Sequence, residues 1–149
     1  LDVQAQGYHA LRTHLGGLQG TLHLVVPPRP RGERNAVIQM PVGQWSAKGP
    51  TARAIDLASI EYRIEEYRDA IKHYEEAMKL GRIDTRRQRD VYLGLARCYA
   101  LEKKYKDAQQ WLQRAPISRR QLAELASDPD FREMAAHSKY GKTFGSDKG

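Results

Sequence analysis

Hydrophobic residues recur at the helical period through the middle of the chain. Between Ala54 and Leu80, apolar side chains return every three or four residues, as they do along one face of an α-helix. This run is interrupted at Glu65-Glu66, which predicts a tight turn between two helices. A second periodic run extends from Val91 to Ala115 and breaks at Glu102-Lys103-Lys104. The middle of the chain is therefore expected to form two helical hairpins.

Helix start and stop signals frame these runs. Gly81 follows the first run where a C-cap glycine belongs, and Pro116 ends the second because proline cannot continue a helix. Ser118 opens a further short helical pattern. Asp128-Pro129 opens another, with aspartate as N-cap and proline at the first helical position. We expect residues 117–137 to form a pair of capping helices.

The first fifty residues differ in character. They contain five of the seven prolines, which helices exclude from their interiors. Residues 21–26 and 36–42 are short apolar runs bounded by Gly or Pro, which is typical of strands. The two runs could pair as a β-hairpin, but an isolated hairpin is marginal in water. We expect an extended arm that packs on the helical part or on a partner.

These patterns predict a mainly α fold with three regions. Residues 1–50 form the arm, residues 51–137 form a helical domain with its C-terminal cap, and residues 138–149 form a flexible tail. Because the chain begins at Leu1 rather than Met, we expect a processed product or a fragment.

The two hairpins repeat each other at a period of 38 residues. Tyr67 aligns with Tyr105, and the following Asp-Ala pair recurs at the same offset in both units. Leu57 and Ala58 likewise align with Leu95 and Ala96. A fixed period of this size indicates a repeat architecture in which each unit buries its apolar face against its neighbours.

The repeated positions resemble the tetratricopeptide repeat. The second unit matches the packing pattern of that family at eight positions: Tyr92, Leu95, Ala96, Tyr99, Tyr105, Ala108, Leu112 and Ala115. The first unit matches at six: Leu57, Ala58, Tyr67, Ala70, Tyr74 and Ala77. It departs from the pattern at Glu61, where the family has an aromatic residue. The resemblance implies a short solenoid of helix pairs, with two repeats within residues 51–116.

The resemblance also implies a binding face. In this family the first helix of each pair lines a concave surface. The corresponding partner-binding positions here are Ile55, Ser59, Tyr62, Arg63, Leu93, Arg97 and Leu101. Arginine can bind a carboxylate through two hydrogen bonds and tyrosine offers rigid contact area, so this face suits a protein segment with some acidic character. The alternative is that the N-terminal arm fills part of the same face.

The net charge of +7 does not by itself indicate nucleic acid, because basic residues are spread over the whole chain. The densest basic patch lies in the turn between the repeats, at Arg82, Arg86, Arg87 and Arg89. We expect no aromatic interleaving of the kind that single-strand binders use for base stacking, either in this patch or at Lys103, Lys104 and Lys106. A solvated or protein-docking loop is the favoured interpretation, and an RNA-binding site is the alternative.

Catalytic and metal-binding patterns are missing from the sequence. The five histidines are scattered, and the single cysteine excludes both a disulfide scaffold and a cysteine-based zinc site. His73 is expected on a solvated helix face, and Cys98 is expected to be a buried, inert thiol. No apolar run is long enough to cross a bilayer. The sequence therefore predicts a protein that is not an enzyme and needs no cofactor or metal.

Two functions remain. The first is a non-catalytic interaction module, an assembly factor or accessory scaffold subunit that binds protein partners through the concave face and the N-terminal arm. The second is an RNA-binding organellar protein, for instance one associated with a ribosome. The sequence does not identify the compartment: cytoplasm and an organelle matrix or lumen both fit, and so does peripheral docking on a membrane complex.

Overall fold

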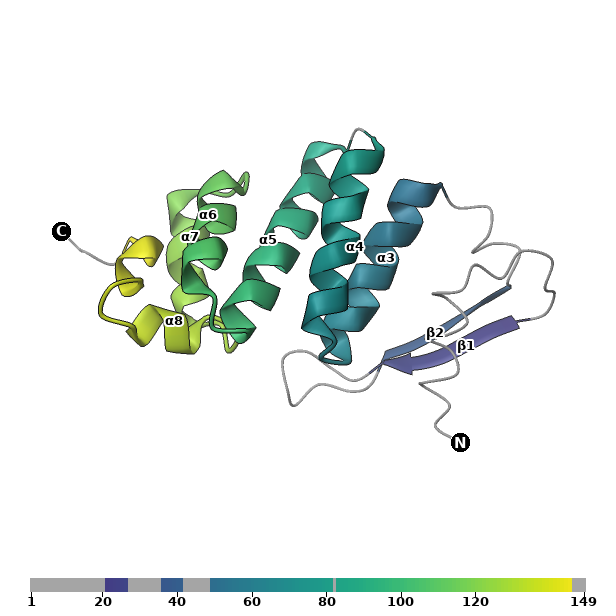
Figure 1. Ribbon diagram of the computed structural model, residues 1–149, viewed down its shortest axis with the longest axis horizontal. Coiled ribbons are helices and arrows are strands. Elements are labelled where there is room, and N and C mark those ends of the chain that lie inside the picture. The colour runs from purple at the N-terminus through teal and green to yellow at the C-terminus, as the bar shows by residue number, and fades with distance from the viewer. Residues whose placement is uncertain (1–20, 27–35, 42–48, 82, 146–149) are drawn as a thin grey trace. The chain divides into compact units, whose positions relative to one another are not determined.

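The structure is a computed structural model that describes residues 21–26, 36–41, 49–81 and 83–145 (Figure 1). The chain divides after Gly81 into two compact units. The first holds the strands β1 (Thr21–Val26) and β2 (Ala36–Pro41) and the helices α3 (Pro50–Arg63) and α4 (Tyr67–Leu80). The second holds the elements α5 (Thr85–Leu101), α6 (Tyr105–Arg114), α7 (Arg119–Glu124), η1 (Leu125–Ser127), α8 (Arg132–Ala136) and η2 (Gly141–Phe144).

In the first unit, α3 and α4 pack side by side as a helical hairpin (Figure 1). Pro50 begins α3 at a position where a missing backbone N–H does no harm. Ala58, Ala70 and Ala77 are completely buried, and their small side chains let the two helices approach closely. The first predicted hairpin is confirmed.

The same turn joins the helices in both hairpins. Glu65 and Lys103, 38 residues apart in the sequence, have positive φ angles of 66° and 62°. The next residue in each case donates its N–H to a carbonyl five positions earlier: Glu66 to Glu61 and Lys104 to Tyr99, both at 2.8 Å. These bonds satisfy carbonyl groups at the helix ends. The predicted turns are therefore confirmed, and the repeat extends to backbone geometry.

The core of the second unit joins the α5–α6 hairpin to the residues that follow it. Its buried members come from α5, α6, α8, the residue before α8, and η2: Ala96, Ala100, Ala108, Leu112, Phe131, Met134 and Phe144. Ser118 begins α7 with a capping box, in which its hydroxyl accepts from the N–H of Gln121 and the Gln121 side chain accepts from the N–H of Ser118. The predicted helix start at Ser118 is confirmed.

Two predictions for the C-terminal region are wrong. Residues 138–145 are not a flexible tail, because η2 folds back and Phe144 is only 1% exposed in the core. The last helix begins at Arg132 rather than at Asp128-Pro129, because the Asp128 carboxylate accepts from the N–H of Asp130 and from a side chain of α5. Residues 146–149 lie outside the described part of the chain.

In the N-terminal region, β1 and β2 pair antiparallel, with Thr21 opposite Pro41 and Val26 opposite Ala36. Residues 1–20, 27–35 and 42–48 lie outside the described residues, and so does Arg82. The expectations that concern how the arm packs stay predictions.

Candidate functional site

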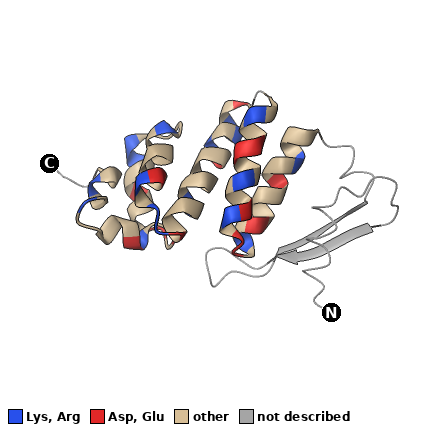
Figure 2. Ribbon diagram, viewed as in Figure 1, with Lys and Arg blue, Asp and Glu red and all other residues tan. Residues whose placement is uncertain are grey.

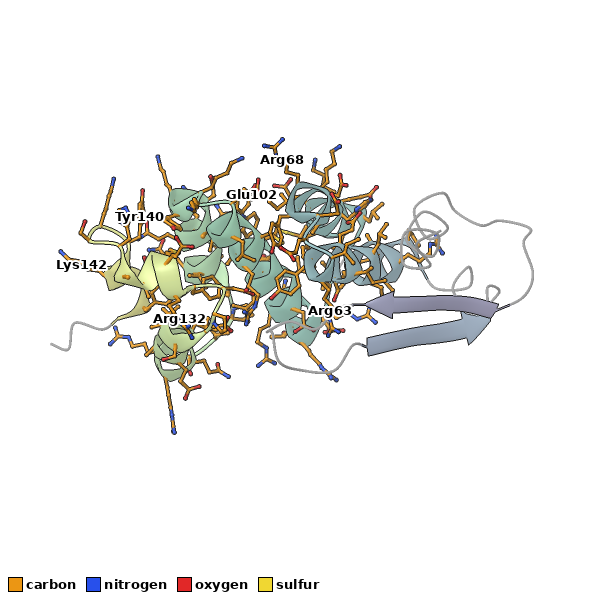
Figure 3. All side chains as sticks on the ribbon, turned by 90° about the horizontal axis from the view of Figure 1, so that it is seen from below. Arg63, Arg68, Glu102, Arg132, Tyr140 and Lys142 are labelled. Atoms are coloured by element: carbon orange, nitrogen blue, oxygen red, sulfur yellow. The ribbon has the colours of Figure 1, made fainter. Side chains whose placement is uncertain are left out.

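Four of the predicted partner-binding residues share one face of α3. Ile55, Ser59, Tyr62 and Arg63 follow helical spacing, and each is partly buried. The Tyr62 ring lies 6.4 Å from the ring of Tyr67, the first residue of α4. Figure 3 shows Arg63 and Arg68 on opposite sides of the α3–α4 hairpin. We call this set of four the α3 face.

The remaining three predicted residues share one face of α5. Leu93, Arg97 and Leu101 are spaced four residues apart, and all are partly buried. Arg97 Nη1 donates to Asp128 Oδ2 at 2.7 Å and to Asp130 Oδ2 at 3.1 Å. Its guanidinium also lies over the ring of Phe131, 5.4 Å from the centroid. Arg97 is thus already bound to two carboxylates and an aromatic ring of its own chain.

The helix face of the second repeat is therefore covered by the C-terminal segment, residues 127–145. Leu93 packs against the same core cluster as Phe131 and Phe144. The N-terminal arm was the predicted alternative occupant of this surface. Among the described residues, the occupant comes from the other end of the chain. An arginine on this face and the string Asp128-Pro129-Asp130-Phe131 were the available signals.

The predicted anionic-partner patch lies at the start of α5. Arg86 and Arg87 are exposed in its first turn, and Arg89 is partly buried. Asp84 caps the helix by accepting from the N–H of Arg87 at 2.9 Å. The first turn contains no acidic residue, but the Asp84 carboxylate at the N-cap offsets part of the positive charge of its side chains and of the helix dipole. This end of α5 therefore presents two exposed arginines beside one carboxylate.

Three further features of the described residues concern metal binding, the cysteine thiol and membrane-spanning helices. No group of three or more His, Cys, Asp or Glu side chains there is arranged to hold a metal ion. The Cys98 thiol is buried. Among the described helices, none has the length and apolar character needed to cross a membrane.

A sequence profile described as tetratricopeptide repeat matches residues 50–115. These residues are tetratricopeptide repeats. The match spans the α3–α4 and α5–α6 hairpins and ends before the C-terminal segment. No curated protein and no solved structure gave a match. Tetratricopeptide repeats are typically non-catalytic and suggest a protein–protein interaction module, and no catalytic family was found.

Glu61, the departure from the tetratricopeptide pattern, has a structural partner. Its side chain is completely buried, and Oε1 lies 2.6 Å from Nδ1 of His73 on α4. A buried carboxylate needs such a polar partner because losing water is costly. The prediction that His73 is solvated is wrong, since its side chain is only 20% exposed and joins the two helices of the first repeat.

Proposed function

We propose that this protein is a non-catalytic interaction module that binds a partner protein segment on the α3 face. The repeats are the observation that carries the proposal, because they suggest protein partners. The α3 face combines an aliphatic side chain, a hydroxyl, a tyrosine and an arginine. Tyrosine and arginine are enriched among residues that dominate binding energy at protein interfaces.

The second repeat supports assigning recognition to the first. Arg97 and Leu93 are used in packing the C-terminal segment, so their contribution to a partner interface would require that segment to move. Leu101 stays a proposed contact. Arg63 supplies a guanidinium, which binds carboxylates well in bidentate geometry. The partner segment we propose therefore carries apolar residues together with Asp or Glu.

At the level of the whole molecule, we propose an assembly factor or an accessory scaffold subunit of a larger complex. The N-terminal arm supports this role, because a two-stranded hairpin such as β1–β2 is marginal without further packing. A partner subunit could supply that packing.

The alternative is RNA binding at the arginine patch. Arg86 and Arg87 are exposed and lie at the positive end of α5, which supports binding of an anionic backbone. No aromatic residue lies within the Arg82–Arg89 stretch to stack on bases. For this reason we rank it second.

A comparative pull-down tests the proposal. The tagged full chain and the variant Tyr62→Ala/Arg63→Glu are used to recover proteins, with Arg68→Glu as a matched charge reversal on the other side of the hairpin (Figure 3). We expect the double variant to lose specific partners that the Arg68→Glu variant retains. Equal recovery of the same partners by all three proteins would contradict a role for the α3 face.

A further inference from the structure

Three aromatic rings form a triangle on the second unit. Tyr105 is the first residue of α6, whereas His137 and Tyr140 lie between α8 and η2. The ring centroids are 5.5 Å apart for Tyr105 and His137, 5.9 Å for Tyr105 and Tyr140, and 5.2 Å for His137 and Tyr140. The fold therefore gathers rings that are 35 residues apart in the sequence, which the spacing of aromatic residues did not indicate.

The two tyrosine rings contact the core on one side, and all three rings are at least partly exposed to solvent. Tyr105 and Tyr140 pack against the core cluster and stay partly exposed, and His137 is exposed. The His137 Nδ1 accepts from the N–H of Lys139 at 3.1 Å, which fixes the plane of the imidazole. The Lys139 ammonium in turn lies 5.3 Å from the centroid of the Tyr140 ring. The triangle is thus a preformed aromatic surface.

Four lysines lie close to two of these rings in the sequence. Lys104 and Lys106 flank Tyr105 in the sequence, and Lys139 and Lys142 flank Tyr140. All four are exposed, and none has an ion-pair partner among the residues that the structure describes. Figure 2 shows basic residues both in the turn between α5 and α6 and around η2, and Figure 3 shows Tyr140 and Lys142 close together and away from Arg132. We call the three rings and these four lysines the lysine–tyrosine surface.

We propose that the lysine–tyrosine surface binds single-stranded nucleic acid. Proteins that bind single strands combine positive charge along the backbone with aromatic side chains on which bases stack. Every base has a π face, so three neighbouring rings can accept bases without sequence readout. Each lysine can neutralise one phosphate and release the counterion bound to it.

The aromatic rings favour a nucleic-acid strand over an acidic peptide, because bases offer π faces for stacking and the side chains of Asp and Glu do not. Lysine can bind phosphate oxygens as a compact point charge. The four cations of this surface are all lysines. The proposal is independent of the α3 face, because the lysine–tyrosine surface lies wholly within the second unit and shares no residue with that face.

Fluorescence anisotropy with a labelled twelve-nucleotide uridine strand tests the proposal, using the full chain at 50 to 200 mM KCl. Loss of a stacked base is worth about 1–3 kcal/mol, so Tyr140→Leu should weaken binding by about 5- to 150-fold. Tyr140→Phe keeps the ring and should bind like the parent protein. The double variant Lys104→Gln/Lys106→Gln should reduce the slope of log K against log salt by about 1.4, because single strands give about 0.7 per phosphate contact.

Two matched controls remove positive charge elsewhere on the same unit. Arg132→Gln lies away from Tyr140 (Figure 3). Arg86→Gln/Arg87→Gln lies at the far end of α5, whose 17 residues span about 25 Å. Neither variant should change the affinity for the strand by more than about twofold, because salt at these concentrations screens charges that lie far from the strand. Thermal unfolding followed by circular dichroism checks that all variants are folded.

Three outcomes would overturn the proposal. The first is absence of binding by the parent protein at 50 mM KCl. The second is loss of binding in the Arg86→Gln/Arg87→Gln variant while the Lys104→Gln/Lys106→Gln variant binds like the parent protein. That result would show that the strand binds at the arginine patch. The third is equal binding of a labelled poly-glutamate peptide that competes with the strand, which would make the surface a docking site for acidic proteins. A deoxythymidine strand of the same length separates DNA from RNA binding.

Discussion

The contact of Arg97 with the C-terminal segment gives the sharpest test of the fold. Replacing Arg97 by Met keeps an unbranched side chain over Phe131 but removes both hydrogen bonds to Asp128 and Asp130. These bonds hold residues 127–145 against α5, so their loss should destabilise the second unit selectively.

The expected magnitude follows from burial. A hydrogen bond to a charged group contributes about 1.5–3 kcal/mol, and breaking a fully buried ion pair costs about 3–5 kcal/mol. The side chains of Arg97 and Asp128 are each 23% exposed, and that of Asp130 is 7% exposed. Solvent therefore screens part of the interaction, which places the loss for Arg97→Met at about 2–3 kcal/mol.

Urea denaturation followed by tryptophan fluorescence measures this loss in the second unit. The chain has two tryptophans, and in a Trp45→Phe background Trp111 reports alone. The ring centroid of Trp111 on α6 lies 5.4 Å from that of Tyr92 on α5, so the tryptophan reports on the α5–α6 hairpin. Arg120→Met is the control, because its ion pair with Glu124 is 90% and 66% exposed and should contribute little.

A double-mutant cycle with Asp130→Asn adds a second readout. We expect a coupling free energy of about 1–2 kcal/mol between Arg97 and Asp130, because the effects of two mutations within one ion-pair network on the free energy of unfolding do not add. If Arg97→Met and Arg120→Met unfold at the same urea concentration, the covering of α5 by the C-terminal segment is refuted.

Three further changes test separate parts of the structure. Phe144→Ala should cost about 3–5 kcal/mol, measured by the same denaturation, because the ring is buried in the core of the second unit; a flexible tail would give no change. Lys103→Gly should stabilise by about 0.5–1 kcal/mol in thermal unfolding, since glycine adopts the positive φ of this turn without a Cβ penalty; destabilisation would refute the turn geometry. His73→Leu should cost about 2 kcal/mol because it removes one polar partner of the buried Glu61 carboxylate, and adding Glu61→Leu should recover much of this loss; additive losses in the pair would contradict their contact.

Local sequence signals predicted the helices of this fold well. Periodicity located both hairpins, and interruption of that periodicity located the turns that contain Glu65 and Lys103. The helix start at Ser118 was also predicted, whereas its capping box with Gln121 was not, although all its groups lie within four residues of the chain. These features depend on interactions between near neighbours, which a single sequence displays directly.

Contacts between distant segments were not predictable in the same way. Arg97 lies 31 and 33 residues before its two carboxylate partners. Read alone, it is a cation on a helix face, and nothing nearby in the sequence indicates what covers it. Residues 138–149 were predicted to be a flexible tail, yet Phe144 is buried in the core of the second unit.

The same difficulty explains how the aromatic surface was missed. Aromatic interleaving was predicted to be missing around Lys103, Lys104 and Lys106, although Tyr105 lies among them in the sequence. The other two rings come from the C-terminal segment and meet Tyr105 only after the chain folds back.

The central claim is that the α3 face binds a partner protein, and site-specific photocrosslinking tests it most directly. A photoreactive phenylalanine analogue is placed at Ser59 or Tyr62 of the full chain, and at exposed Lys72 of α4 as the control. After irradiation in the source cells, our account predicts discrete protein adducts from positions 59 and 62 and none of the same adducts from position 72. Identical adducts from all three positions, or none from position 59 or 62 while position 72 reacts, would contradict it.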